Sequence, residues 1–314
     1  MKKIDIERMH GNIMRRSYNL ELVNREAKDN LDALIATSEE IYRSQIRKVC
    51  SEIIEKAYPM VLLAGPSSSG KTTTSHLIRK CLTEQGINSI VVSLDDFFVN
   101  REDTPRLPDG SYDFECLEAI DLKYLNKFVD ELLKTKKSKM PLFDFLTGTR
   151  KEKFVDVELG EKTVVIFEGI HALNPNLIKG HDDKMYKIYV CVNSNFDIGM
   201  DVVIPAKKLR MMRRLIRDYY FRGHSIETTL GLWTNVCRGE DKYIKPYKIT
   251  ANYLIDSTHM YEPLVYANYL PALLKRSESE EAAELAEMLK RCGKLKKDVV
   301  PSGSMLWEFL TKDN

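Results

Sequence analysis

Residues 65–72 read Gly65-Pro66-Ser67-Ser68-Ser69-Gly70-Lys71-Thr72, a complete G-x-x-x-x-G-K-T sequence. The apolar run at 60–64 precedes it, and the residues from Thr73 onward have helical spacing. A glycine-rich turn between a strand and a helix is the setting in which this sequence binds phosphate. The stretch therefore predicts a nucleoside triphosphate site in an α/β protein with the P-loop NTPase fold.

Each fixed position of this loop has a physical reason. Glycines let the backbone turn its N–H groups around a polyphosphate, which also meets the positive end of the following helix. We expect residues 65–70 and Thr73 to surround the phosphates of ATP. Lys71 is expected to reach the β- and γ-phosphates, and the Thr72 hydroxyl to bind Mg²⁺.

Composition narrows the class of protein. The chain has 314 residues, of which 43% are hydrophobic and 30% charged, and its formal net charge is +2. This small charge predicts neither a nucleic-acid nor a membrane partner. No apolar run approaches the roughly 18 residues needed to span a bilayer, and the six cysteines are scattered. We therefore expect a cytoplasmic protein with reduced thiols.

The core alternates short β-branched runs with helical segments, a pattern typical of a parallel sheet flanked by helices. The predicted strands are 60–64, 89–94, 163–167, 186–192 and 253–255. The predicted helices are 72–85, 119–134, 207–221 and 262–274.

Two extensions flank this core, which we place at 59–275. Residues 1–58 form a predicted helical extension, in which a capping box at Thr37 and Glu40 opens the second helix. Its apolar stripes must be buried against the core or against another copy of the chain, so a homo-oligomer is an expectation. Residues 276–314 form a predicted solvated helical tail, with four apolar residues that dock: Leu306, Trp307, Phe309 and Leu310.

Acidic residues follow two of the predicted strands. Ligands in such sheets sit beyond the carboxyl ends of the strands, so Asp95 would face the γ-phosphate and could accept a proton from a hydroxyl. Asp96 should face the other way. Glu168 ends an apolar strand in a Walker-B-like manner and is expected to hold Mg²⁺. The alternative for Asp95 is that it merely caps a turn. The alternative for Glu168 is that it faces solvent at the end of the strand.

A third cluster is basic. Arginines at 210, 213, 214 and 217 share one face of the predicted helix, and Arg222 follows at its end. Like charges on one face repel one another unless an anion sits there, which suggests a lid at about 207–245 that closes over a phosphoryl group. The alternative is a basic face paired with acids such as Asp218.

Four motifs in this order (65–72, 93–98, 168–170 and 213–223) resemble the uridine kinase/phosphoribulokinase group of P-loop kinases. The resemblance covers roughly residues 60–260 and is greatest to uridine–cytidine kinases. It implies an ATP- and Mg²⁺-dependent kinase domain. Asp95 would be the catalytic base and Glu168 a Mg²⁺ ligand, while Lys71, Arg217 and Arg222 would stabilise the transferred group.

The acceptor positions implied by the resemblance match less closely. Glu115 falls where the family holds ribose hydroxyls, and Arg214 falls beside the sugar. Phe143 and Gly148 stand where the family has Tyr and His for the base, and His224 replaces a second arginine. A phenyl ring stacks on a base but does not hydrogen-bond its edge. A site that hydrogen-bonds the polar edge of a base discriminates between bases far more strongly than an apolar site does.

We therefore expect phosphoryl transfer to a hydroxyl of a small molecule, with the 5′-hydroxyl of a nucleoside as the first acceptor. Within this class, a sugar phosphate or a pantothenate-like compound is the alternative acceptor. A different class is an ATP-gated switch that uses the N-terminal helices as its effector surface. Residues 126–129 read Asn-Lys-Phe-Val and lack the final Asp of an N-K-x-D guanine-binding motif, which argues against a GTPase.

Overall fold

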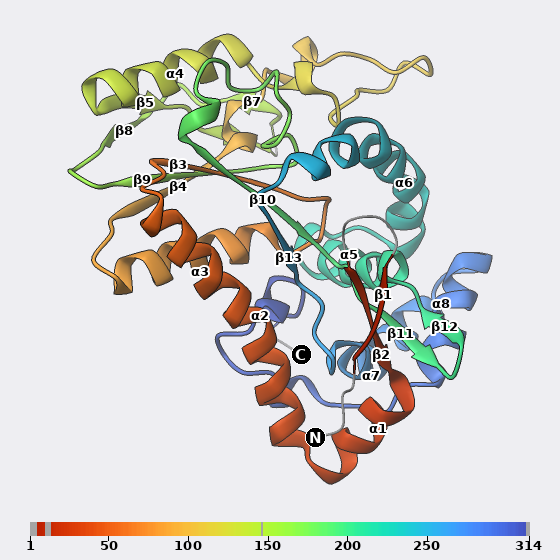
Figure 1. Cartoon of the computed structure of the whole chain (residues 1–314). Helices are drawn as coiled ribbons and strands as arrows, with labels where there is room; N and C mark the ends of the chain where they lie inside the picture. The colour runs from red at the N-terminus through yellow and green to blue at the C-terminus, as the bar shows by residue number, and fades with distance from the viewer. Residues whose placement is uncertain (1–4, 10–13, 146, 312–314) are drawn as a thin grey trace.

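Five parallel strands form the central sheet, in the order β13-β10-β3-β9-β4 (Figure 1). They are β3 (Met60–Ala64), β4 (Ser89–Ser93), β9 (Val164–Glu168), β10 (Met185–Cys191) and β13 (Tyr253–Asp256). The structure is a computed structural model that describes residues 5–9, 14–145 and 147–311. All five predicted strands are confirmed. Because β9 and β10 lie on opposite sides of β3, the loop after β3 emerges where the strand order reverses, the usual ligand position in such sheets.

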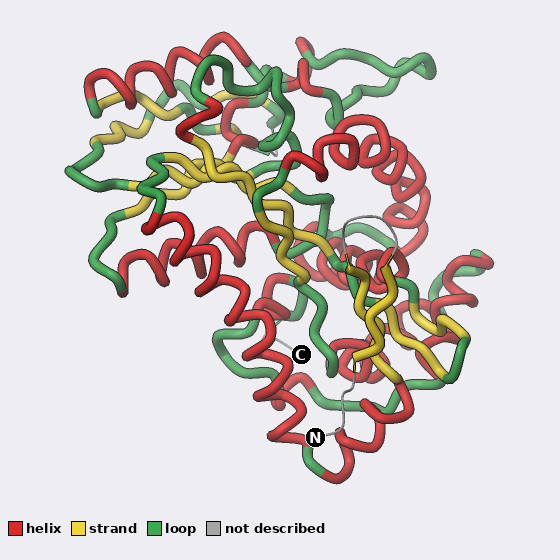
Figure 2. The backbone as a smooth tube through the Cα atoms, in the orientation of Figure 1, coloured by secondary structure: helices red, strands yellow, loops and turns green. Residues whose placement is uncertain are grey.

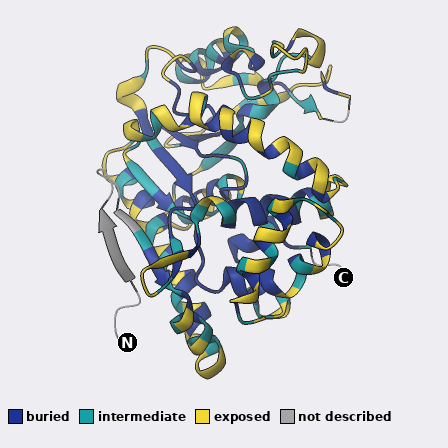
Figure 3. Ribbon diagram, turned by 90° about the vertical axis from the view of Figure 1, so that its right-hand side faces the viewer, coloured by how far each residue is buried: buried dark blue, intermediate teal, exposed yellow. Residues whose placement is uncertain are grey.

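Helices cover both faces of this sheet, as Figure 2 shows. Alternate residues of β3 enter two separate apolar clusters. Val61 and Leu63 pack with α2 (Leu31–Glu55) and α3 (Lys71–Glu84), while Leu62 packs with α4 (Leu122–Thr135). The three central strands, β3, β9 and β10, are accordingly buried between the two helical layers, whereas the edge strands β4 and β13 are mostly half-buried (Figure 3). The predicted α/β class is therefore confirmed.

The remaining long helices are α5 (Ala206–Arg222), α6 (Ile226–Gly239), α7 (Glu262–Leu274) and α8 (Glu280–Lys290). Leu209, Met212 and Leu215 of α5 are buried in the larger apolar cluster. The arginine-rich helix is thus part of the core, and closure of residues 207–245 as a lid stays a prediction. None of the described helices is both long and apolar enough to cross a membrane.

The N-terminal extension contains strands that the sequence did not predict. β1 (Asp5–Met9) and β2 (Met14–Asn19) form a second sheet with β11 (Asn195–Ile198) and β12 (Asp201–Ile204), in the order β1-β2-β11-β12. β2 runs parallel to β11, and the Ser17 hydroxyl donates a hydrogen bond to Asp197. The sequence of β2 lacks Val, Ile and Thr, so its strand propensity is weak.

The helical part of the extension breaks at a different place from the predicted one. α1 (Leu20–Asp29) ends at Asn30, and α2 then runs without interruption through Thr37. The predicted capping box at Thr37 is therefore wrong. The face that carries Ser38 and Tyr42 is buried, and Ser38 accepts a hydrogen bond from the amide of Met260, so tertiary contacts keep this turn helical.

The segment after α7 is not simply a solvated tail. α8 buries Leu285 and Leu289 in the core, which corrects that expectation for its inner face. The predicted docking is confirmed for Leu306, Phe309 and Leu310, which are all buried. Smaller antiparallel pairs lie near α4: β5 (Lys137–Met140) with β8 (Val155–Glu158), and β6 (Phe143–Asp144) with β7 (Thr149–Arg150).

Candidate active site

The phosphate loop has the backbone that its glycines predicted. Gly70 precedes α3 with a φ of 90°, a left-handed conformation that favours glycine, and Ser68 also has a positive φ of 60°. At Gly65, a Cβ atom would lie 2.1 Å from the carbonyl oxygen of Val190 on the neighbouring strand. Glycine at 65 lets the loop pass close to β10, and glycine at 70 lets it turn into the helix.

Polar groups of the loop lie ready for an anion. Lys71 Nζ donates to the carbonyl oxygen of Pro66 across 3.2 Å, so its ammonium group lies over the loop. The hydroxyl groups of Ser68 and Ser69 are buried and make no hydrogen bond in the described structure. Buried polar groups without a partner are rare, and phosphate oxygens could satisfy both.

Asp95 lies in a short 3-10 helix, η1 (Leu94–Phe97), that follows β4. Burial raises the pKa of Asp95, and the positive charges of Lys71 and Arg222 oppose this shift. Both cations are therefore close enough to act on the carboxyl group. Asp96 holds a neighbouring strand instead: its carboxylate accepts a hydrogen bond of 3.2 Å from the amide of Phe143 in β6.

Glu168 ends β9 beside the same loop. Burial raises its pKa to about 7, and the charge of Lys71 only partly offsets the cost of burial. Its Oε1 accepts a hydrogen bond of 3.2 Å from the Ser93 hydroxyl, so the ends of β4 and β9 hold the carboxyl group in place. Lys71, Asp95 and Glu168 thus come together at the carboxyl ends of three adjacent strands.

The oxygen atoms near the loop suit a hard cation. Mg²⁺ prefers carboxylate, hydroxyl and phosphate oxygens, and Glu168 and Thr72 offer the first two. The described residues contain no group of three or more His, Cys, Asp or Glu side chains that would hold a metal by themselves. Phosphate oxygens of a bound nucleotide would complete such a site.

The arginines divide into two groups around different acids. Asp218 is fully buried and is approached by Arg214 Nε at 3.2 Å, Arg217 Nη2 at 2.7 Å and Arg222 Nη1 at 3.5 Å. The prediction that arginines 210, 213, 214 and 217 together surround an anion is wrong for two of them. Arg210 pairs with Glu240 and Arg213 with Glu262, and both of these pairs are buried.

A cleft of about 680 Å³ opens beside these groups. Its lining includes the predicted acceptor residues Glu115 and Arg214. Burial raises the pKa of Glu115, while the charges of Arg214 and Lys71 oppose the shift. The lining also includes three cations that sequence reasoning missed because no motif marks them: Arg106, Arg238 and Lys242.

Two predicted acceptor residues do not line this cleft. Phe143 packs on Phe98 and Phe145, with ring centroids 5.7 and 5.2 Å away. His224 lies just past the end of α5, where its amide donates to the carbonyl oxygen of Asp218. The structure therefore does not bring these two together with Glu115 and Arg214.

Gly148 is covered by another side chain. A Cβ atom there would lie 2.5 Å from Arg101 Nε, so the Arg101 guanidinium occupies the space beside this glycine. Arg101 Nη2 also donates to the carbonyl oxygen of Phe145 across 3.3 Å. A histidine at 148 would displace this arginine, which makes the hairpin chemically different from the one the resemblance implies.

Sequence reasoning also missed Glu308. Its carboxylate accepts a hydrogen bond of 3.0 Å from the amide of Thr73, a residue 235 positions earlier in the chain. No local pattern around Glu308 predicts this contact, because it depends on how the 304–310 segment packs.

Comparison with known proteins assigns the family. The model of the Phosphoribulokinase / Uridine kinase family matches residues 60–261. A uridine kinase from Ureaplasma urealyticum is 25% identical over 194 residues, or 62% of this chain and 85% of that protein. A uridine kinase from Bacillus pumilus is 28% identical over 202 residues, or 64% of this chain and 87% of that protein.

Among solved structures, phosphoribulokinase from Rhodobacter spheroides is similar with a TM-score of 0.42 and 19% identity, over 62% of this chain and 68% of the other. The family match itself runs from the first residue of β3 to the residue before α7, and so includes the phosphate loop, Asp95, Glu168 and α5. The resemblance predicted from the motifs is confirmed, and the chain belongs to the phosphoribulokinase/uridine kinase family.

Proposed function

We propose that the chain is an ATP- and Mg²⁺-dependent kinase that phosphorylates a hydroxyl group of a small molecule, with a nucleoside as the leading acceptor. One observation carries the proposal: Lys71, Asp95 and Glu168 meet at the mouth of the phosphate loop, beside a cleft large enough for a metabolite. The relatives named uridine kinase favour a nucleoside.

The phosphates of ATP need hydrogen-bond donors and cations that are already in position around them before the reaction. The loop amides and Lys71 would hold the β- and γ-phosphates. Thr72 and Glu168 would hold Mg²⁺, which neutralises charge on the phosphates when bound. Lys71 would exchange its bond to Pro66 for one to a phosphate oxygen, since both are acceptors within the reach of one side chain.

On the acceptor side, Asp95 would take the proton from the attacking hydroxyl, a role typically worth 10²–10⁴ in rate. The nearby Arg222 would stabilise charge on the transferred group, as would Arg217 from the same helix. Glu115 would accept hydrogen bonds from acceptor hydroxyls and Arg214 would orient them, because both line the cleft. Phe143 and His224 remain predicted acceptor residues that would require a movement toward the cleft.

A second acceptor class has its own support. Arg106, Arg238 and Lys242 give the cleft three cations beyond those beside the phosphate loop. Arg238 is exposed, and no hydrogen bond or salt bridge to it is found among the described residues. Its charge contributes to the lowered pKa of Asp109, which hydrogen bonds from Ser111 mainly cause. A neutral nucleoside has no use for such charge, whereas an acceptor with a phosphate or carboxylate group would gain from it. An anionic, hydroxylated metabolite is therefore the second candidate.

The test is ADP release with a panel of nucleosides, sugar phosphates and hydroxy acids. Acceptor-dependent ADP release supports the kinase, and ATP binding without any acceptor dependence would favour the switch protein instead. Arg238→Ala separates the acceptor classes, with Arg276→Ala on the surface as the matched control. Arg238→Ala should raise KM for an anionic acceptor and leave KM for a nucleoside unchanged.

A further inference from the structure

A short segment from the far end of the chain lies directly on the phosphate loop. It forms a 3-10 helix, η8 (Met305–Glu308). A Cβ atom on Gly70 would lie 2.8 Å from Met305 Sδ, so this side chain packs against the last glycine of the loop. One turn later, Glu308 Oε2 accepts the hydrogen bond of 3.0 Å from the amide of Thr73.

This amide belongs to the anion-binding end of α3. The first N–H groups of a helix have no partner within the helix, and the helix dipole favours negative charge beside them. Thr73 is the third residue of α3 and follows Lys71 and Thr72 of the phosphate loop. The Glu308 carboxylate therefore binds a donor that the loop otherwise directs toward a phosphate.

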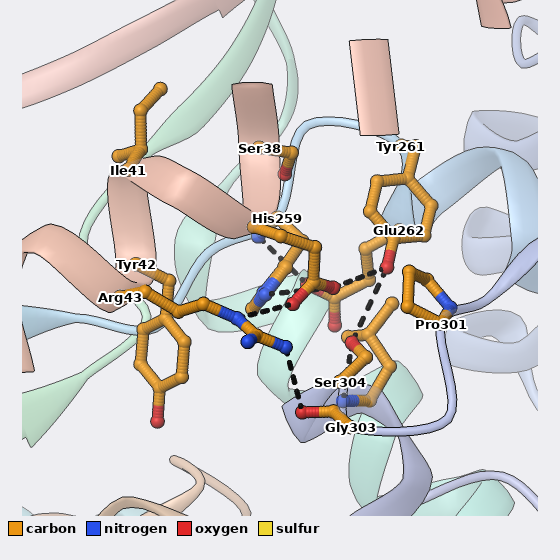
Figure 4. Close-up of polar contacts among 12 residues, drawn as sticks. Ser38, Ile41, Tyr42, Arg43, His259, Tyr261, Glu262, Pro301, Gly303 and Ser304 are labelled. Carbon is orange, nitrogen blue, oxygen red and sulfur yellow. Dashed lines mark hydrogen bonds and ion pairs between the residues drawn. The ribbon is translucent and has the colours of Figure 1, made fainter. Parts of the chain in front are cut away.

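The backbone of the segment is firmly held. In Figure 4, Ser304 and Gly303 face Tyr261 and Arg43, which come from the loop before α7 and from α2. The Ser304 hydroxyl lies 3.3 Å from the hydroxyl of Tyr261, and Arg43 Nη2 donates to the carbonyl oxygen of Gly303 across 3.4 Å. The backbone before η8 is thus tied to two separate elements.

The end of the segment is equally fixed. Phe309 is fully buried and lies under the guanidinium group of Arg213, 5.0 Å from the ring centroid. Glu308 itself is only partly buried. Movement of the whole segment would expose Met305, Leu306 and Phe309, whereas rotation of the Glu308 side chain alone would not.

The charge of Glu308 also acts on another group of α3. Burial and the charge of Arg79 lower the pKa of His76, and the charge of Glu308 opposes this shift. A carboxylate this close to the loop would repel the α- and β-phosphates of a nucleotide as well as compete for the Thr73 amide.

We propose that Glu308 is a built-in competitor of the donor nucleotide: its carboxylate occupies the Thr73 amide in the empty site and swings away when donor phosphate binds. The 304–310 segment thereby lowers donor affinity from within the chain. This inference rests on the nucleotide site of the proposed function and adds a residue that sets its affinity.

The experiment measures the Kd of ADP and of adenosine by calorimetry for the wild type, Glu308→Ala and Glu308→Gln. Glu287→Ala on the exposed face of α8 is the matched control. Removal of the carboxylate should tighten ADP binding about two- to fivefold, the range set by a charge at a helix terminus. Binding of adenosine, which has no phosphate, should stay unchanged. Gln keeps the size of the side chain and its acceptor oxygen, so Glu308→Gln retains the fold while it removes the charge.

Other outcomes overturn the inference. Unchanged or weaker ADP binding, together with a lower unfolding temperature, would make Glu308 an ordinary helix cap. Weaker adenosine binding would make it a ligand of the donor nucleoside instead. If none of the proteins binds ADP, the proposed donor site is wrong, and the inference is then wrong as well. Equal ADP binding by the wild type and both variants would overturn the inference alone.

Discussion

The Ser93 hydroxyl donates a hydrogen bond to Glu168 Oε1 across 3.2 Å, which joins the ends of β4 and β9. The carboxyl group is otherwise costly to keep there, because burial raises its pKa to about 7 from an ordinary value of 4.5. A group kept at such a cost beside a phosphate loop is a candidate for function. It also makes the stability of the protein depend on pH.

The folded protein binds one more proton at Glu168 than the unfolded chain between about pH 4.5 and 7. Its contribution to the free energy of unfolding therefore falls as pH rises through this range. Glu168→Gln, which stays neutral and can still accept from Ser93, should be more stable than the wild type at pH 8 by on the order of 3 kcal/mol. Near pH 4.5 the two should be nearly equal. Thermal unfolding at both values, without Mg²⁺ or nucleotide, checks this, and an equal difference at both would contradict the assigned pKa.

Arg213 should be a structural residue, although the sequence places it among the phosphate-binding arginines. Its guanidinium group pairs with Glu262, and both side chains are fully buried. Arg213→Met would leave the buried Glu262 carboxylate without its cation, with the amide of His259 as a remaining hydrogen-bond donor. It should lower the free energy of unfolding by about 3–5 kcal/mol. Denaturant unfolding measures this loss. The double variant with Glu262→Met should recover part of it, and no recovery would mean that the pair is not the cause.

Arg222 should behave in the opposite way. Its side chain is 51% exposed and lies at 3.5 Å from Asp218, which keeps Arg214 and Arg217 as partners. Arg222→Ala should therefore hardly change the unfolding temperature, yet lower kcat by as much as ~10³, the lower range for an arginine that stabilises a transferring phosphoryl group. Arg276→Ala is the control for loss of a surface cation. A kcat equal to that of the wild type would remove Arg222 from the mechanism.

The elements near the loop were predictable because their signals are local. Strand β3 is a continuous apolar run, and β9 is an apolar run that ends in Glu168. Gly65 allows a close approach to β10, and Gly70 has a left-handed backbone that other residues adopt poorly. The positions of Asp95 and Glu168 follow from one general property of parallel sheets, that ligands bind at the carboxyl ends of the strands.

The rest depends on contacts between distant parts of the chain. Arg213 and Arg217 are the same residue type four positions apart. Only the placement of Glu262 and Asp218 decides that Arg213 joins a core ion pair, while Arg217 joins the arginines around Asp218. The helix break at Asn30 rather than Thr37 reflects the partners that α2 finds on the loop before α7. Glu308 reaches Thr73 only because Met305 and Phe309 are buried beside it.

The most direct test of the central claim follows the γ-phosphate of labelled ATP in the wild type and in Asp95→Asn, with the best acceptor from the panel. We expect the label to appear in the acceptor at one equivalent per ADP released. Asp95→Asn should lose this transfer by about 10²-fold or more while it still binds ATP. Near-normal transfer by Asp95→Asn would contradict the assigned base, and label released only as inorganic phosphate would contradict the kinase.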